Sequence, residues 1–403
     1  MRSLIQKWNS LSLVVRILCG IVVGIILAVA VPELTWLSML GTLFISALKA
    51  VAPILVFVLV INALASHRSG KKTNMKTIIM LYVVGTFVAG FVGVLTAKLF
   101  PITLSLKPSE TELTPPSGIG EVFEKLLTNI FANPVEALMS ANYIGILAWA
   151  IILGFALKAS SDTTKTVLSN LSDGITKVVQ WIIALAPFGI IGIMYDAIVT
   201  SGFGELKKYG SLIILLVGCM LFIALVINPL IVWIVARRNP YPLVLTSLKE
   251  SGITAFFTRS SAANIPVNIK LCEKLGLDKN TYSVSIPLGA TINMGGAAVT
   301  ISVLTMVAAH TLNVEVDIPT AVILMVITTI SAAGASGVTG GSLLLIPLAC
   351  GLLGIPNDIA MQVVGVGLII GVVQDSCETA LNSSSDIVFT AAAQYADELK
   401  NKK

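Results

Sequence analysis

The stretch SAAGASGVTGGS, residues 331–342, interrupts a run of 40 residues, Ile318 to Asn357, that carries no charge. One straight helix of that length would measure about 60 Å, whereas the hydrocarbon core of a bilayer is only about 30 Å thick. The run must therefore fold back, and the Gly, Ser and Thr residues of the stretch mark the turn. Irregular backbone at membrane depth survives only where protein buries it or where it lines a wet cavity. We expect a re-entrant helical hairpin over about residues 318–354.

Composition places the whole chain among polytopic membrane proteins. Of its 403 residues, 56% are hydrophobic and 12% are charged, and the mean hydropathy is +0.93, whereas a soluble domain carries about 25% charged residues. The formal net charge of +5 does not indicate nucleic-acid binding, because Lys and Arg collect in short loops between apolar stretches. The five cysteines are scattered without a CxxC pair, and we interpret them as small packing residues.

Six apolar stretches before residue 240 are long enough to cross a bilayer. They lie near residues 12–31, 36–65, 75–100, 141–158, 175–199 and 210–236. Asn228-Pro229 predicts a kink in the sixth stretch, and the polar segment 101–140 is expected to form an aqueous loop outside the cell. A cleaved signal peptide is the alternative for the first stretch, because Ala28-Val29-Ala30 resembles a cleavage site.

Another hairpin, the first in chain order, is expected at about 243–271, with Thr258-Arg259-Ser260-Ser261 at its turn, so that the Gly-rich hairpin over 318–354 is the second. Each hairpin precedes an apolar helix broken by polar residues, over Tyr282–Ala309 and Ile359–Phe389. Hairpin plus broken helix, occurring twice, predicts an inverted repeat. The fold class is therefore an all-α polytopic membrane protein with eight transmembrane helices and two re-entrant hairpins. Lys and Arg in the loops place both termini in the cytoplasm, with Lys207-Lys208 as the exception.

The final broken helix carries three carboxylates within QDSCETALNSSSD, residues 374–386. At 100° per residue, five of its polar side chains share one helical face about 100° wide. These are Asp375, Glu378, Thr379, Asn382 and Asp386. Each charge costs about 2.5–3.5 kcal/mol at the bilayer centre, so the stripe must face protein, water or bound cations.

Arg259 is the one positive charge near enough in this topology to compensate, and it leaves two of the three carboxylates unbalanced. Bound cations are the natural remedy. Because almost every candidate ligand is an oxygen, we expect a hard cation such as Na⁺. Enzyme signatures are weak, since SGKKT (69–73) lacks the first glycine of a P-loop and Cys377 has no base beside it. We expect no enzymatic activity.

Four motifs resemble those of the dicarboxylate/amino acid:cation symporter family. They are TRSSAANIP (258–266), LGATINMGG (288–296), the Gly-rich stretch 331–342 and DSCETALNSSSD (375–386). The resemblance covers essentially the whole chain and is most specific over 251–390. Within the family, the chain most resembles the bacterial Na⁺-coupled serine/threonine carriers. It implies a glutamate-transporter-like fold, which is itself an inverted-repeat example.

The resemblance also implies roles for individual residues. The substrate α-carboxylate would be held at the two hairpin turns by Ser260, Ser261, Val338 and Gly340. Asp375 would bind the substrate ammonium, with Thr379 and Asn382 beside it. One Na⁺ would use carbonyls of Gly289, Asn293 and Asn382 with the carboxylate of Asp386. A second would use carbonyls of Thr291, Ala332, Ala333 and Ala335 near the sulfur of Met294.

Two departures from the family pattern are informative. Relatives that carry acidic substrates have arginine at the position of Glu378, and a carboxylate there would repel Asp or Glu but accept a hydrogen bond from a small hydroxyl. The family motif NMDGT reads here as Asn293 to Ala297, NMGGA. The missing Asp and Thr, with Gly85 near Tyr82, remove ligands of a third sodium site. We therefore expect fewer coupled sodium ions and a preference for serine and threonine.

The predicted function is Na⁺-coupled uptake of small neutral amino acids by alternating access, in the inner membrane of a bacterial cell. From the resemblance alone, 1–73 and 141–209 form a scaffold of a homotrimer. Residues 74–100 and 210–398 form the moving transport domain, and the second hairpin acts as the outer gate. The alternatives are a proton-coupled carrier that uses Glu378, a carrier for other small amino or carboxylic acids, and a channel.

Overall fold

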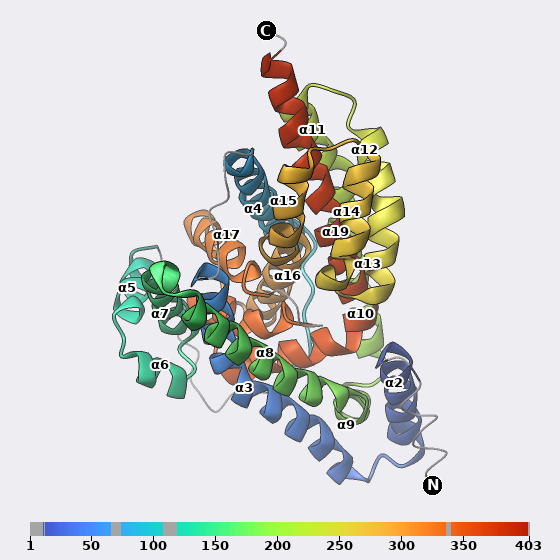
Figure 1. Ribbon diagram of the computed structural model, residues 1–403. Coiled ribbons are helices and arrows are strands. Elements are labelled where there is room, and N and C mark those ends of the chain that lie inside the picture. The colour runs from blue at the N-terminus through green and yellow to red at the C-terminus, as the bar shows by residue number, and fades with distance from the viewer. Residues whose placement is uncertain (1–10, 12, 66–73, 108–118, 336–339, 402–403) are drawn as a thin grey trace.

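The computed structural model describes residues 11, 13–65, 74–107, 119–335 and 340–401, and every regular element in these ranges is a helix (Figure 1). The first half contains α2 (Leu13–Ala30), η1 (Thr35–Leu37), α3 (Ser38–Ala65), α4 (Met75–Leu99), α5 (Ile119–Ile130), α6 (Pro134–Met139), α7 (Tyr143–Ala156), η2 (Leu157–Ala159), α8 (Asp162–Ala184) and α9 (Ala186–Ser201). The second half contains α10 (Gly204–Phe222), η3 (Ile223–Ile227), α11 (Asn228–Ala236), α12 (Tyr241–Ser247), η4 (Leu248–Gly252), α13 (Ile253–Thr258), α14 (Ser261–Lys274), α15 (Lys279–Ile292), α16 (Gly295–Thr311), α17 (Ile318–Ala332), η5 (Leu343–Leu345), α18 (Ile346–Leu352) and α19 (Asn357–Asn401).

Within the described residues, five helical stretches are long and apolar enough to cross a membrane. They are Thr35–Ala65, Met75–Leu99, Gly204–Ala236, Lys279–Thr311 and Asn357–Leu399. The bent pair α8 and α9 makes a sixth if it counts as one span. The chain is thus an all-helical polytopic membrane protein in these ranges, and the count of eight spans stays a prediction.

The stretch 175–199, expected to be one span, is bent. Helix α8 begins at Asp162, capped by the Ser161 side chain, and α9 follows it at an angle of 50°. Pro187 occupies the first turn of α9. Proline has no N–H to donate and its ring collides with the preceding turn, so the helix cannot run straight through this point.

The segment 101–140 is only partly the aqueous loop that its polarity predicted. Residues 101–107 are without regular structure, but α5 and α6 follow. Apolar residues recur every three or four positions from Ile119 to Ile130, the spacing of an amphipathic helix. Asn133 caps α6 by accepting hydrogen bonds from two backbone N–H groups, and Pro134 occupies the first helical position. The sequence therefore contains local signals for both helices, although the polarity of the segment by itself predicted a loop.

The first hairpin region turns where TRSS predicted. Helix α13 ends at Thr258, Arg259 adopts the left-handed conformation with a φ of 51°, and α14 begins at Ser261. The Ser260 side chain caps α14 by accepting a hydrogen bond from the N–H of Ala263. Both arms contact each other and α19.

The uncharged run 318–357 is broken, as its length required. Helix α17 ends at Ala332, and the chain resumes helical structure at Leu343. Asp317 caps α17 by accepting a hydrogen bond from the N–H of Thr320 at 2.8 Å. Hydrogen bonds from Thr320 hold the pKa of the Asp317 carboxyl below its usual value.

The two helices expected to be broken behave differently. The chain from 279 to 311 breaks at Asn293 and Met294, between α15 and α16. Helix α19, in contrast, runs without a break for 45 residues, so the expected break at 374–386 is wrong. The hydroxyls of Ser376, Thr379 and Ser384 donate to carbonyls four residues earlier, so these polar groups find partners within α19.

Packing places α16 and α19 at the centre of the molecule. Every residue of α16 from Gly295 to Ala309 is buried, and α19 contacts α10 through α16 and α18 (Figure 1). Helices α2, α3, α7, α8 and α9 pack mainly on one another, and α4 packs on α16 and α17. The polar face of α19 is therefore buried inside protein.

The contact between α3 and α9 depends on glycine, and this gives a test of the fold. A Cβ on Gly192 would lie 2.4 Å from the backbone nitrogen of Gly41 and 2.6 Å from the carbonyl oxygen of Leu37. We predict that Gly192→Ala lowers the melting temperature of purified protein, because overpacking costs about 1–3 kcal/mol.

The matched control is Gly218→Ala in α10, where a Cβ would meet no atom within 4 Å. Alanine is favoured over glycine in a helix by about 1 kcal/mol, so this variant should melt at or above the temperature of the parent. Equal melting of the two variants would contradict the described packing of α3 on α9.

Candidate functional site

The polar face of α19 meets both hairpin regions and the break between α15 and α16. All five residues of the predicted stripe are buried, with exposed fractions between 0% for Asp386 and 7% for Thr379. The stripe therefore faces protein rather than lipid, and the partners of each side chain decide what it can bind.

Asp375 joins the turns of both hairpin regions. Its Oδ2 accepts a hydrogen bond from Arg259 Nε in an ion pair of 2.7 Å, and its Oδ1 accepts one from the N–H of Gly340 at 3.3 Å. Arg259 also donates to the carbonyl of Gly371. Arg259 therefore compensates Asp375 among the three carboxylates of the stripe.

Glu378 is held by three donors that converge on one of its oxygens. Its Oε2 accepts hydrogen bonds from Thr300 Oγ1 at 2.7 Å, Ser342 Oγ at 2.8 Å and Gln374 Nε2 at 2.5 Å. These donors come from α16, the second hairpin region and α19 itself. The carboxylate thus ties three elements together.

The sequence did not predict these three donors. Gln374 lies one turn before Glu378, and the i, i+4 spacing could have identified it. Thr300 and Ser342 are 78 and 36 residues away from Glu378, and no local signal indicates them. The Oε1 atom of Gln374 is buried and has no hydrogen-bond partner among the described residues. A hydrogen-bond acceptor without a donor therefore lies beside the carboxylate of Glu378.

Asn382 and Asp386 face the break between α15 and α16. Asn382 accepts a hydrogen bond from the N–H of Gly296 at 2.7 Å and donates to the sulfur of Met294. Asn293 donates to Oδ1 of Asp386 at 2.9 Å. The helix break is therefore closed by side chains from α19.

Oδ2 of Asp386 is buried and has no hydrogen-bond partner among the described residues. A buried carboxylate oxygen without compensation is costly, and a cation removes that cost. Around it lie Gly289, where a Cβ would come within 2.4 Å of Oδ1 of Asp386, and Asn293. The residues predicted for the first Na⁺, Gly289, Asn293, Asn382 and Asp386, are thus brought together and fit a cation.

The residues predicted for the second Na⁺ lie at two helix ends. Thr291 and Met294 flank the end of α15, and Ala332, Ala333 and Ala335 follow one another at the end of α17. The last carbonyls of a helix have no intrahelical partner. No cluster of three or more His, Cys, Asp or Glu residues suits a metal in the part of the chain that the structure describes. A cation at these ends would therefore depend on carbonyl oxygens.

The residues predicted for the substrate α-carboxylate lie at the two turns. Ser260 and Ser261 begin α14, and Gly340 has a φ of 71°. Its N–H points to Asp375, whose neighbour Thr379 donates to the Asp375 carbonyl. Val338 lies outside the described residues.

Gly85 marks the place where a third sodium site was expected to be missing. A Cβ on Gly85 would lie 2.7 Å from two ring carbons of Phe389, so that ring fills the space of a side chain. The nearby Tyr82 hydroxyl donates to the carbonyls of Ser285 and Asp386 at 3.1 and 3.4 Å.

The chain was compared with known families and proteins. The sequence model of the sodium:dicarboxylate symporter family matches residues 13–395. Two proteins named serine/threonine transporter SstT, from Streptococcus agalactiae serotypes Ia and V, are each 58% identical over 395 residues, which is 98% of this chain and 98% of each relative. A protein of the same name from serotype III is 57% identical over the same shares. These names describe transporters, in agreement with the prediction that the chain is not an enzyme.

Asp386 provides the test of the cation site. In purified protein, Na⁺ should raise the melting temperature relative to K⁺, because a ligand that binds only the folded state stabilises it. Asp386→Asn removes the charge that compensates the ion, and we predict that the Na⁺ concentration for half-maximal stabilisation rises at least about tenfold.

Asp173→Asn is the control, since Asp173 is exposed on α8. It should respond to Na⁺ like the parent protein. Stabilisation of Asp386→Asn by Na⁺ at unchanged concentrations would contradict the site.

Proposed function

The chain belongs to the sodium:dicarboxylate symporter family, and from this membership we propose that it is a secondary active transporter that couples Na⁺ entry to the uptake of serine and threonine by alternating access. The observation that carries the substrate assignment is the buried carboxylate of Glu378, held by two hydroxyls and an amide. The three relatives named serine/threonine transporter support the same substrates.

Glu378 makes the site suitable for a hydroxyl and unsuitable for an acidic side chain. A second carboxylate brought against it would meet like charge with little water to screen it, at a cost of several kcal/mol. Ser342 already donates to Glu378 at 2.8 Å, and its side chain is chemically that of serine. The pocket thus contains an internal copy of the contact that a serine or threonine substrate would make.

The remaining substrate groups would bind at the hairpin turns. The ammonium would be bound by Asp375 and would share this carboxylate with Arg259, which contacts it at 2.7 Å. The α-carboxylate would bind backbone groups around Ser260, Ser261, Val338 and Gly340. Thr379 and Asn382 would lie beside the bound substrate. The zwitterionic part of the substrate would sit toward Asp375 and its side chain toward Glu378.

Sodium would supply the driving force. The unpartnered Oδ2 of Asp386 supports one Na⁺ site, and the carbonyls near Met294 would form another. Asn382 contacts Met294 and the N–H of Gly296, so this side chain would touch the surroundings of both cation sites and the substrate. We propose this shared residue as the physical link between cation and amino acid binding.

The proposed architecture is eight spans and two re-entrant hairpins in an inverted repeat, with cytoplasmic termini, in a trimer in the bacterial inner membrane. Residues 1–73 and 141–209 would form the scaffold, and 74–100 and 210–398 the transport domain. The mutual packing of α2, α3 and α7 to α9, and of α4 on α16 and α17, supports this division. The second hairpin would be the outer gate, because Ser342 and Gly340 contact the substrate residues of α19.

Uptake by purified protein in liposomes tests the function. An inward Na⁺ gradient should drive accumulation of radiolabelled serine, unlabelled threonine should compete, and unlabelled aspartate should not. The measurement is repeated with an H⁺ gradient in place of Na⁺. Serine uptake that follows the H⁺ gradient and ignores Na⁺ would favour the proton-coupled alternative, and competition by aspartate equal to that by threonine would contradict the role of Glu378.

Ser342 tests the hydroxyl contact itself. Ser342→Ala removes one donor from Glu378, so a hydrogen bond from the substrate hydroxyl should contribute more to stabilising that carboxylate. A hydrogen bond to a charged group is worth about 1.5–3 kcal/mol, and we predict that the ratio of kcat/KM for serine to that for alanine rises on the order of tenfold.

Ser331→Ala is the matched control, because the Ser331 hydroxyl donates to the Ile327 carbonyl of its own helix. It should leave the serine-to-alanine ratio unchanged. A ratio that is unchanged or lower in Ser342→Ala would show that the substrate hydroxyl does not reach Glu378.

A further inference from the structure

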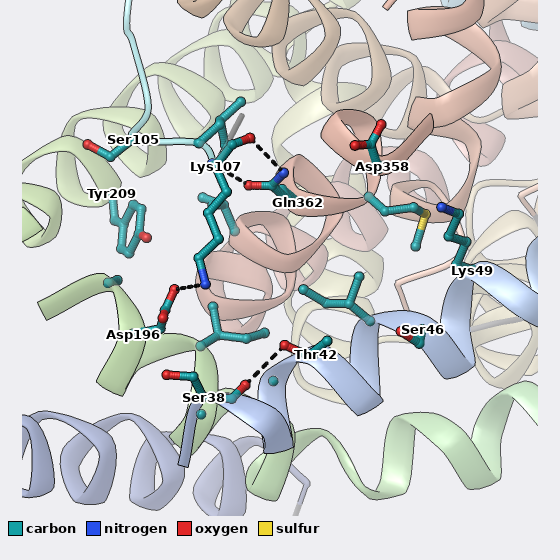
Figure 2. Close-up of a pocket in the computed structure, with 18 residues that line it drawn as sticks. Ser38, Thr42, Ser46, Lys49, Ser105, Lys107, Asp196, Tyr209, Asp358 and Gln362 are labelled. Atoms are coloured by element: carbon teal, nitrogen blue, oxygen red, sulfur yellow. Dashed lines mark hydrogen bonds and ion pairs between the residues drawn. The ribbon is translucent and has the colours of Figure 1, made fainter. Parts of the chain in front are cut away.

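A cavity of about 290 Å³, lined by both apolar and polar side chains, lies away from the candidate site, between α3 and α9 on one side and α10, α19 and the segment 101–107 on the other (Figure 2). It shares no lining residue with the site around Asp375 and Glu378. Its polar lining includes Thr42, Ser46, Lys49, Asp196, Asp358 and Gln362. The volume is near the lower end for small-molecule pockets, which run from about 300 Å³.

Lys107 fixes the walls of this cavity relative to one another. Its backbone N–H donates to Oε1 of Gln362 at 2.7 Å, and its carbonyl accepts from Nε2 of Gln362 at 3.1 Å. Its ammonium forms an ion pair of 2.8 Å with Asp196 on α9 (Figure 2). One residue thus ties α19 to α9, and the charges of Lys107 and Asp196 cancel.

Two further charges of opposite sign line the cavity, and they come from different helices. Lys49 comes from α3 and Asp358 from the first turn of α19 (Figure 2). Neither side chain makes a hydrogen bond or an ion pair with any residue in the described ranges. The cavity therefore presents one cation and one anion that form no ion pair within the described residues.

Lys49 stands alone as a charge on its helix, and its side chain is exposed. It is the one charged residue in the sequence of α3, and it lies 11 residues, about 16 Å, from the start of that helix. A charged side chain within a membrane-spanning segment is costly unless it faces water or a counter-charge. Neither the substrate site nor the cation sites use Lys49.

We propose that the cavity is a second binding site that takes a small zwitterion, with its carboxylate on Lys49 and its ammonium on Asp358. A simple carboxylate would leave Asp358 uncompensated, and a simple amine would leave Lys49 uncompensated. A zwitterion matches both charges and keeps the cavity neutral. At about 30 Å³ per water in the liquid, the volume accommodates such a molecule with a few waters beside it.

Binding at this cavity would also affect transport, and this effect rests on the proposed function. A zwitterion between Lys49 and Asp358 connects α3 of the proposed scaffold to α19 of the proposed transport domain. If those parts move during transport, a ligand that connects them holds them in this arrangement. It would lower the maximum rate of serine uptake and leave its KM unchanged, because it does not touch Asp375 or Glu378.

The first test is binding and does not require transport. β-Alanine is the zwitterionic probe, and propionate and ethylamine are the single-charge controls, titrated into purified full-length protein in a calorimeter. β-Alanine should bind, and Lys49→Met and Asp358→Asn should each weaken that binding at least about tenfold. Propionate and ethylamine should bind at least about tenfold more weakly than β-alanine.

Lys207→Met is the matched control, since Lys207 is an exposed lysine of α10 outside the cavity lining. It should bind β-alanine like the parent. Retained stabilisation by Na⁺ in Lys49→Met shows that this variant is folded. Absence of β-alanine binding to the parent, or binding that Lys49→Met leaves unchanged, would overturn the proposed site.

The second test is transport in liposomes with β-alanine added outside. The maximum rate of serine uptake should fall in the parent and in Lys207→Met but not in Lys49→Met. Competitive inhibition that persists in Lys49→Met would place β-alanine in the site around Asp375 and overturn the proposal. β-Alanine binding that depends on Lys49, found in a protein that transports no serine, would instead leave the second site standing and contradict the proposed function.

Discussion

Each carboxylate buried on α19 is stable only if a counter-charge, a set of donors or a bound cation compensates it, and the surrounding structure follows from this constraint. Asp375 has Arg259 at 2.7 Å. Glu378 has three donors on one oxygen. Asp386 has one donor, Asn293, on Oδ1 and none among the described residues on Oδ2. The three carboxylates thus differ in what they still lack, and this difference suggests three different roles.

The same constraint explains where the backbone is irregular. The turn at Arg259 brings a guanidinium to Asp375, and the turn before Leu343 brings Gly340 and Ser342 to the same face of α19. The break at Asn293 frees a side-chain amide and backbone groups beside Asp386. Irregular backbone at membrane depth persists only where it is buried or hydrated, and here it is also where the carboxylates obtain their partners.

Much of this arrangement could be predicted from the sequence, because its signals are local. The uncharged run 318–357 is too long for one span, TRSS at 258–261 places a charge and two small polar residues at a turn, and the helical period puts Asp375, Glu378 and Asp386 on one face. The bend at Pro187 and the helix capped by Asn133 also carried local signals, which hydropathy and polarity concealed. The donors Thr300 and Ser342 carry no such signal, because only the tertiary packing brings them to Glu378. The hydroxyls in the polar stretch of α19 are satisfied within the helix itself, and composition alone does not distinguish these from hydroxyls that interrupt a helix.

The central claim is that cation binding at Asp386 is thermodynamically coupled to amino acid binding a few turns away on the same helix. Coupling between two ligands is reciprocal, so it can be measured in the direction opposite to uptake. Liposomes with equal Na⁺ on both sides and an inward serine gradient should accumulate radiolabelled Na⁺, and an inward alanine gradient should do so less effectively. Serine that enters the liposomes without any net movement of Na⁺ would contradict the account.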